Sequence, residues 1–114
     1  MRRPDVAARS NIHVRGPEGA PAMVFAHGFG CDQSMWRHVA PEFEDRFRTV
    51  VFDHVGFGGS DLAAFDPDRY GTLQGYADDV VDIVQSLDLG PVTFVGHSVS
   101  AMIGVLAAAS SPAD

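Results

Sequence analysis

Residues 92–104, VTFVGHSVSAMIG, constrain the fold more than any other part of the sequence. Residues 92–95 are a β-branched and aromatic run of strand length, and they follow the turn signal Gly90-Pro91. Residues 99–109 are small and apolar, form a run too long for a strand and are rich in helix formers, which predicts a helix. Ser98 lies at the junction of the two elements. We therefore expect a sharp strand-to-helix turn that lifts its hydroxyl clear of a sheet.

A turn of this kind suits a nucleophilic serine. A serine hydroxyl is a weak nucleophile, so it must be exposed to substrate and within reach of a base. The turn favours small residues on either side, here Gly96 and Ser100, and the next helix directs its first N–H groups towards a developing oxyanion. Ser100 stands where the usual G-x-S-x-G pattern has its last glycine. Because so short a match is common by chance, an ordinary strand-to-helix loop is the alternative.

Three more runs have strand character. Residues 11–15 alternate polar and apolar, which predicts an edge strand, whereas residues 23–26 and 48–52 are almost unbroken apolar runs. Helices are expected from Asp32 or Ser34 to about Phe43, and over residues 72–89, where the apolar positions recur on one face. The acids that lie off this second apolar face predict a solvated surface; they are Asp78, Asp79 and Asp82.

Strand and helix alternate along the chain, and unbroken apolar strands are typical of strands buried on both faces. This order predicts an α/β fold with a mostly parallel sheet and helices on both faces. Ligands bind such sheets at the carboxyl ends of the strands. The loops at residues 27–30, 53–60 and 96–98 meet that condition, and we expect Asp53 to fix a backbone turn rather than to catalyse.

Composition excludes several classes of partner. The chain has no lysine and a formal net charge of −7, which argues against a nucleic-acid or anionic-membrane partner. Its single cysteine, Cys31, cannot form an internal disulfide and is expected to be a small buried residue without a redox task. No apolar segment follows Arg2-Arg3, and residues 101–109 are too short to span a bilayer. We expect a cytoplasmic protein whose first ten residues are disordered.

Three motifs in order resemble the α/β-hydrolases. More narrowly, the chain resembles the family of the bacterial stress-regulatory hydrolase RsbQ and the plant karrikin and strigolactone receptors. The likeness runs from about Asn11 to the end of the chain. The motifs that carry it are His27-Gly28-Phe29-Gly30, Phe52-Asp53-x-x-Gly56-x-Gly58-x-Ser60-Asp61 and Gly96-His97-Ser98-Val99-Ser100-Ala101-Met102-Ile103-Gly104.

The resemblance implies a role for several residues. Ser98 would be the catalytic nucleophile, and the backbone N–H groups of Phe29 and Val99 would form the oxyanion hole. Phe29 and His97 would line the substrate pocket, although a core position is the alternative for the Phe29 ring. The resemblance implies no metal and no cofactor.

The triad of this fold runs serine, acid, histidine along the chain. After Ser98 the sequence has one acid, Asp114, and no histidine, because all five histidines lie upstream. We therefore expect residues 1–114 to be a partial α/β-hydrolase domain, the N-terminal portion, lacking the lid and the C-terminal strands. Such a chain is expected to be inactive alone. Its 92–95 strand would be an open edge with apolar faces.

Two functions from different classes remain open. The first is a serine hydrolase that acts on an ester or lactone of a small hydrophobic compound through an acyl-serine intermediate. The second is a sensor that binds a small hydrophobic ligand and a regulatory protein partner. A dinucleotide-binding unit is excluded, because Gly56-Phe57-Gly58-Gly59 does not match G-x-G-x-x-G. The segment from Asp61 to Tyr70 is also expected to be irregular instead of opening a helix, as that pattern requires.

Overall fold

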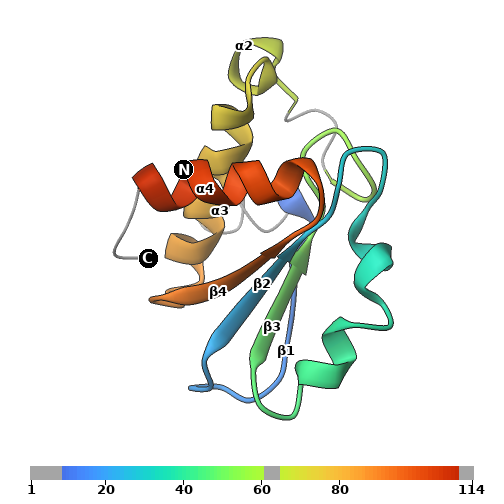
Figure 1. The fold of residues 1–114 in the computed structure, drawn as a ribbon, viewed down its shortest axis with the longest axis vertical. Coiled ribbons are helices and arrows are strands. Elements are labelled where there is room, and N and C mark those ends of the chain that lie inside the picture. Colours follow the sequence, from blue (N-terminus) through green and yellow to red (C-terminus); the bar gives the residue numbers. More distant parts are fainter. Residues whose placement is uncertain (1–8, 61–64, 111–114) are drawn as a thin grey trace.

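The computed structural model describes residues 9–60 and 65–110, and in this part of the chain four strands form one sheet (Figure 1). The strands lie in the order β1-β3-β2-β4. β1 is antiparallel to β3, and the other two pairings are parallel. The strands are β1 (His13–Arg15), β2 (Ala22–Ala26), β3 (Arg48–Phe52) and β4 (Val92–Gly96). The helices are η1 (Gln33–Trp36), η2 (Ala40–Phe43), α2 (Pro67–Tyr70), α3 (Leu73–Ser86) and α4 (Val99–Ser110).

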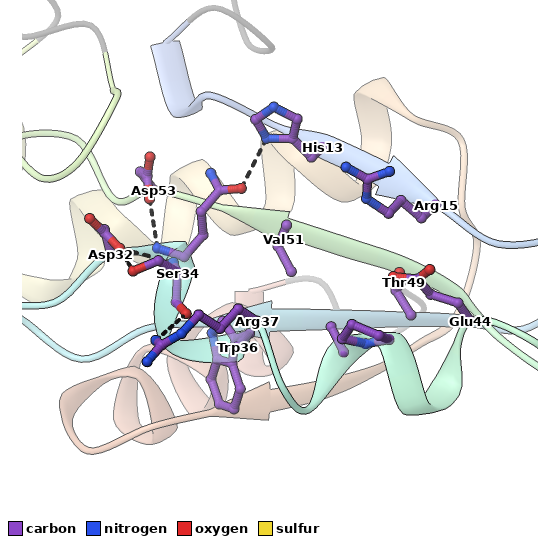
Figure 2. A pocket seen from close by; sticks show the side chains of 13 residues that line it. His13, Arg15, Asp32, Ser34, Trp36, Arg37, Glu44, Thr49, Val51 and Asp53 are labelled. Atoms are coloured by element: carbon purple, nitrogen blue, oxygen red, sulfur yellow. Dashed lines mark hydrogen bonds between the residues drawn. The ribbon is translucent and has the colours of Figure 1, made fainter.

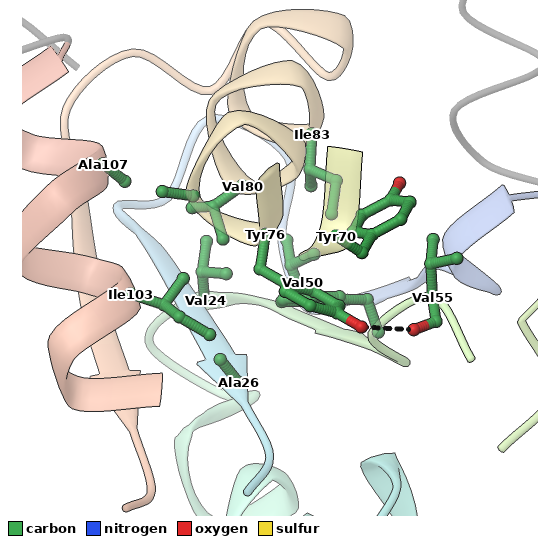
Figure 3. Packing of buried hydrophobic residues seen from close by; sticks show 12 residues of the cluster. Val24, Ala26, Val50, Val55, Tyr70, Tyr76, Val80, Ile83, Ile103 and Ala107 are labelled. Carbon is green, nitrogen blue, oxygen red and sulfur yellow. Dashed lines mark hydrogen bonds between the residues drawn. The ribbon is translucent and has the colours of Figure 1, made fainter. Parts of the chain in front are cut away.

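β2 lies inside the sheet and is buried along its whole length. Because side chains alternate along a strand, Val24 and Ala26 face the cluster that α3 and α4 cover, whereas Met23 and Phe25 face η1 and η2. Figure 3 shows the first of these clusters, with side chains of β2, β3, α3 and α4 in contact. The expected fold class, a mostly parallel sheet with helices on both faces, is confirmed.

The α-helix expected from Asp32 or Ser34 to about Phe43 is not formed. The chain instead forms two short 3₁₀ helices, η1 and η2. Asp32 caps η1 by accepting a hydrogen bond from the Ser34 N–H. Pro41 explains the break, because proline has no N–H to bond the carbonyl one α-helical turn earlier. The segment before Tyr70 also differs from expectation, since it contains the short helix α2.

The expected helix after Thr72 is confirmed as α3, but one of its acids is not solvated. Asp79 is 2% exposed. Its carboxylate accepts hydrogen bonds from Arg69 Nη2 at 2.6 Å and from the Tyr70 hydroxyl at 2.7 Å, and Arg9 Nη2 lies 3.3 Å away. Burial and the neighbouring Asp79 carboxylate raise the pKa of Tyr70 to about 12, so this hydroxyl remains a donor at neutral pH. The acid joins α2 and α3 to the chain before β1.

The expectation of a disordered N-terminus lies partly outside the described residues, because the description begins at Arg9. Arg9 and Ser10 differ from that expectation: both have helical backbone and are 5% and 1% exposed. The Ser10 carbonyl accepts a hydrogen bond from the Asp53 N–H at 2.8 Å. This segment therefore packs on the sheet and on α3.

β4 is an edge strand in the described part of the chain, where it pairs only with β2. Its residues are at most half-buried, unlike those of β2. On the adjoining helix α4, Ile103 and Ala107 are buried, but Met102 and Val105 are 54% and 63% exposed. Among the described helices, none has both the length and the apolar character needed to cross a membrane.

Candidate functional site

The turn between β4 and α4 has the sharp geometry expected of it. Ser98 is exposed and has a φ of 59°, in the left-handed region that residues other than glycine rarely adopt. α4 begins at the next residue, Val99. Backbone in this region costs of order 1–3 kcal/mol and is concentrated at functional sites. The sharp turn therefore holds the serine at the end of the strand, open to solvent.

The small residue before this turn is required by packing. A Cβ atom on Gly96 would lie 2.7 Å from the backbone carbonyl carbon and oxygen of Ser100. Backbone cannot move aside as a flexible side chain can, so glycine permits the close approach of β4 and α4. Ser100 is completely buried beneath the turn.

The loop at residues 27–30 lies beside the turn. β2 and β4 are parallel, and the last residues of the two strands, Ala26 and Gly96, are register partners. The His97 N–H then donates to the Ala26 carbonyl at 3.1 Å. Among the hydrogen bonds found between described residues, none uses the backbone N–H of Phe29 or Val99.

The Phe29 ring is neither core nor fully exposed. It is 41% exposed and stacks on Phe57 with the ring centroids 5.1 Å apart. Tyr76 and His54 complete its surroundings, at centroid distances of 5.0 Å and 5.7 Å. The ring thus has one face on an aromatic cluster and an open side, which suits the wall of an apolar binding site.

His97 is exposed and lies against Gly28, since a Cβ atom on that glycine would be 2.6 Å from His97 Nδ1. The imidazole therefore covers the loop next to the turn. Cys31, on the same loop, is exposed, so the expectation of a buried cysteine is wrong. The loop runs over the surface at this point, and a small apolar side chain there has no core to enter.

Asp53 joins three separate segments of the chain by hydrogen bonds. It is 1% exposed, and Oδ1 accepts from the Gln33 N–H at 2.8 Å. Oδ2 accepts from Asn11 Nδ2 and from the Gly59 N–H, both at 2.9 Å. The expected turn-fixing role is confirmed and extends to the segments before β1 and in η1.

Asp53→Asn is expected to lower the free energy of unfolding by about 1–3 kcal/mol, because the amide nitrogen cannot accept one set of these bonds and leaves buried donors unpaired. Urea unfolding followed by circular dichroism measures the change. Asp45→Asn is the control, because the Asp45 side chain is 79% exposed. Equal stability of the two variants would contradict the role assigned to Asp53.

Two histidines and a serine form a buried network that sequence reasoning missed. The backbone N–H of His54 donates to His27 Nε2 at 2.9 Å, and His27 Nδ1 lies 2.7 Å from the Gly28 carbonyl oxygen. His54 Nε2 lies 2.7 Å from Ser100 Oγ, which donates to the His27 carbonyl at 2.5 Å. The sequence signal that could have predicted this network is position, because His27 and His54 each follow a strand at the same edge of the sheet.

Burial, and to a smaller extent the neighbouring His27, lowers the pKa of His54 from 6.5 to about 3. The neutral form is favoured in the folded state, so this stabilisation is complete above pH 6.5 and is lost as the pH falls towards 3. We expect His54 to contribute up to about 1.4 kcal/mol of lost stability per pH unit in that window. Urea unfolding between pH 7 and pH 4 should give a shallower dependence for His54→Phe than for the unsubstituted protein. Identical pH dependences would contradict the assignment.

A pocket of about 420 Å³ lies elsewhere, between β1 and the two 3₁₀ helices (Figure 2). Arg15, Arg37 and Glu44 contribute charges of both signs to its walls. Asp53 and the residues around the cap of η1 line it, but Ser98 and Phe29 do not. The pocket is therefore separate from the turn. Within the described residues, no three His, Cys, Asp or Glu side chains are grouped so that they could hold a metal ion.

Known proteins share both the sequence and the fold. Residues 21–113 match the family described as alpha/beta hydrolase fold. A karrikin insensitive 2 receptor of Petunia hybrida is 46% identical over 102 residues, which is 90% of this chain and 37% of the receptor. A strigolactone esterase of Arabidopsis thaliana is 41% identical over 112 residues, covering 98% of this chain and 42% of the esterase.

Among solved structures, a hydrolase from Oleispira antarctica has a TM-score of 0.94 and 46% identity, covering 99% of this chain and 41% of that one. The chain thus spans less than half the length of each of these relatives. The resemblance inferred from the three motifs, to α/β-hydrolases and to the karrikin and strigolactone proteins, is confirmed.

Proposed function

Because the chain belongs to the family of the alpha/beta hydrolase fold, we propose that Ser98 is the nucleophile of a serine hydrolase. Its substrate is an ester or lactone of a small hydrophobic compound. The observation that carries the proposal is the exposed serine with a φ of 59° between β4 and α4. Relatives that are named as an esterase and a hydrolase support the reaction class.

In the proposed reaction, Ser98 Oγ attacks the substrate carbonyl carbon and passes its proton to a general base. The carbonyl electron pair moves to the oxygen, which accepts hydrogen bonds from the N–H groups of Phe29 and Val99. Collapse of this intermediate breaks the ester bond, the protonated base gives its proton to the leaving oxygen to form the alcohol, and an acyl group remains on Ser98. Water then hydrolyses the acyl-serine. The sequence of steps needs neither a metal nor a redox cofactor, and the apolar Phe29 ring suits a hydrophobic acyl group.

Residues 9–60 and 65–110 show no general base bonded to the proposed nucleophile. In the described part of the structure, no histidine or carboxylate is hydrogen-bonded to the Ser98 hydroxyl, and His27 and His54 are buried in their own network. We therefore propose that residues 1–114 alone turn over esters only at the residual rate that binding and an oxyanion hole support.

Covalent labelling tests the proposal. A fluorophosphonate probe should label the gene product that contains this chain, and mass spectrometry of the digested protein should locate the phosphonate on Ser98. Ser98→Ala should remove the label, whereas Ser34→Ala, at another exposed serine, should keep it. A folded gene product that the probe leaves unlabelled at Ser98 would overturn the proposed function.

A sensor is the second candidate, favoured by the 46% identity to a protein named as a receptor. In this function the site at Phe29 and Ser98 binds a small hydrophobic ligand, and a regulatory protein recognises the complex. The two functions differ in their need for the hydroxyl. Ligand-dependent capture of a partner that survives Ser98→Ala supports the sensor, whereas capture that requires ester turnover supports the enzyme.

A further inference from the structure

We propose that Ser100, held by His54, is a positioning residue that fixes the Phe29 amide relative to Ser98 and the Val99 amide. This inference rests on the proposed function, because it concerns the two N–H groups assigned there to the oxyanion. The two amides belong to different segments, the loop after β2 and the first turn of α4. A hydrogen bond between those segments sets the distance between the two donors.

Ser100 supplies such a bond through its side chain. It is completely buried in the first turn of α4, next to Val99. Its hydroxyl donates to the carbonyl oxygen of His27, two residues before Phe29, at 2.5 Å. The glycine that usually occupies this position has no hydroxyl and cannot make the bond. The loop is thus attached to the turn by a side chain, in addition to the backbone bond from His97 to Ala26.

The proton positions in the network follow from one another. Because Ser100 gives its single proton to the His27 carbonyl, Oγ must accept from His54, which places a proton on His54 Nε2. His27 Nε2 accepts from the backbone N–H of His54. The His27 ring proton is therefore on Nδ1 and is donated to the Gly28 carbonyl. Every bond then has one donor and one acceptor, with both rings neutral.

The surroundings of His54 make the arrangement rigid. The ring meets Phe52, Tyr76 and Phe29 edge-on, with interplanar angles of 87°, 86° and 87°. His54 is 1% exposed, and its Nδ1 has no hydrogen-bond partner among the described residues. Among the described residues, the His54 imidazole therefore makes one hydrogen bond, the one to Ser100. It keeps the Ser100 oxygen oriented so that the serine proton points at the loop.

Removing the Ser100 hydroxyl should act on the transition state more than on substrate binding. The oxyanion forms only during reaction, so misplaced donors lower kcat while KM changes little. An error of about 1 Å in such a site can cost roughly 100-fold. We expect Ser100→Ala to lower kcat for nitrophenyl esters about 10- to 100-fold, with KM changed less than about threefold. His54→Phe, which keeps the Ser100–His27 bond but loses its orientation, should lower kcat by a smaller factor.

The experiment uses steady-state kinetics of the gene product and inhibition by a phenylboronic acid, whose adduct with Ser98 resembles the tetrahedral intermediate. In Ser100→Ala the boronate should bind more weakly by the same factor by which kcat/KM falls, and Ser100→Thr, which keeps a hydroxyl, should recover part of both. Ser86→Ala is the matched control, because Ser86 also donates to a backbone carbonyl, at 3.1 Å, but in α3. It should leave kcat unchanged.

Each outcome has one meaning. A folded Ser100→Ala protein with unchanged kcat and boronate affinity overturns the positioning role, while labelling of Ser98 in the same protein leaves the proposed function intact. A lower kcat without weaker boronate binding also overturns it, because the oxyanion donors are then undisturbed. If the unsubstituted protein neither hydrolyses esters nor reacts with the fluorophosphonate, the proposed function itself has failed.

Discussion

Ser98→Ala is expected to lower kcat/KM for nitrophenyl esters by roughly 10⁴-fold or more in the gene product, because the acyl-serine can no longer form. The substitution should not disturb the fold: Ser98 is exposed, and alanine is only one oxygen smaller. The measurement is initial rates over a range of ester concentrations, with circular dichroism to show that the variant is folded. The remaining rate would come from binding and from the two amides.

Ser34→Ala is the control for this comparison, since Ser34 is also exposed but its hydroxyl donates to Asp32 in the cap of η1. Its kcat/KM should be unchanged within a factor of about two, as surface substitutions usually have small effects. A Ser98→Ala protein that hydrolyses esters at the unsubstituted rate would rule out the acyl-serine pathway. Binding of a small hydrophobic ligand by that variant would then favour the sensor.

Asp79→Ala is expected to lower the free energy of unfolding by about 3–5 kcal/mol, the usual cost of breaking a buried ion pair by removing one partner. Arg9 would remain buried, with a side chain 6% exposed, and would lose the Asp79 carboxylate at 3.3 Å while the Asp82 carboxylate stays 3.5 Å away. Arg69 and the Tyr70 hydroxyl would lose their acceptors at 2.6 Å and 2.7 Å. Urea unfolding at neutral pH measures the loss.

Asp78→Ala is the matched control, one residue earlier on the same helix. Asp78 accepts a single exposed hydrogen bond, from Gln74 at 2.9 Å, so its removal should cost less than about 1 kcal/mol. If the two alanine variants are equally stable, the ion-pair network around Asp79 contributes nothing to the fold. Asp79→Asn should fall between them, because the amide keeps one acceptor oxygen for the Tyr70 hydroxyl or for Arg69.

The spacing of apolar residues along the chain predicted the elements in which that spacing is regular. The apolar runs gave the three parallel strands, and the recurrence of apolar residues after Thr72 gave α3. Both signals are short-range, since strand and helix faces repeat every two and every 3.6 residues. Where Pro41 interrupts the chain, the same pattern described two 3₁₀ helices as a single helix. Proline removes a backbone donor that an α-helix needs.

Contacts between segments distant in sequence could not be predicted from the local sequence pattern. Asp79 lies off the apolar face of α3, as a solvated acid does, and it is buried because Arg9, 70 residues earlier, and Arg69 approach it in space. In the sequence, His54 is a polar residue that follows a strand. Only in the folded structure does Ser100 Oγ lie 2.7 Å from its Nε2. Cys31 was expected in the core and lies on an exposed loop. For Asp79 and His54, the contacts with Arg9 and Ser100 join residues that are far apart in sequence.

The sequence by itself determined the strand–turn–helix around Ser98, the mostly parallel sheet and the α/β-hydrolase family. Those features depend on residues close together in the chain: a glycine where β4 and α4 touch, a serine at the turn and apolar runs of fixed length. Only the tertiary structure decided which buried polar groups pair, because His27, His54 and Ser100 meet where three separate strands end. A buried hydrogen bond depends on atoms brought within about 3 Å, and that distance is set by the packing of the whole sheet.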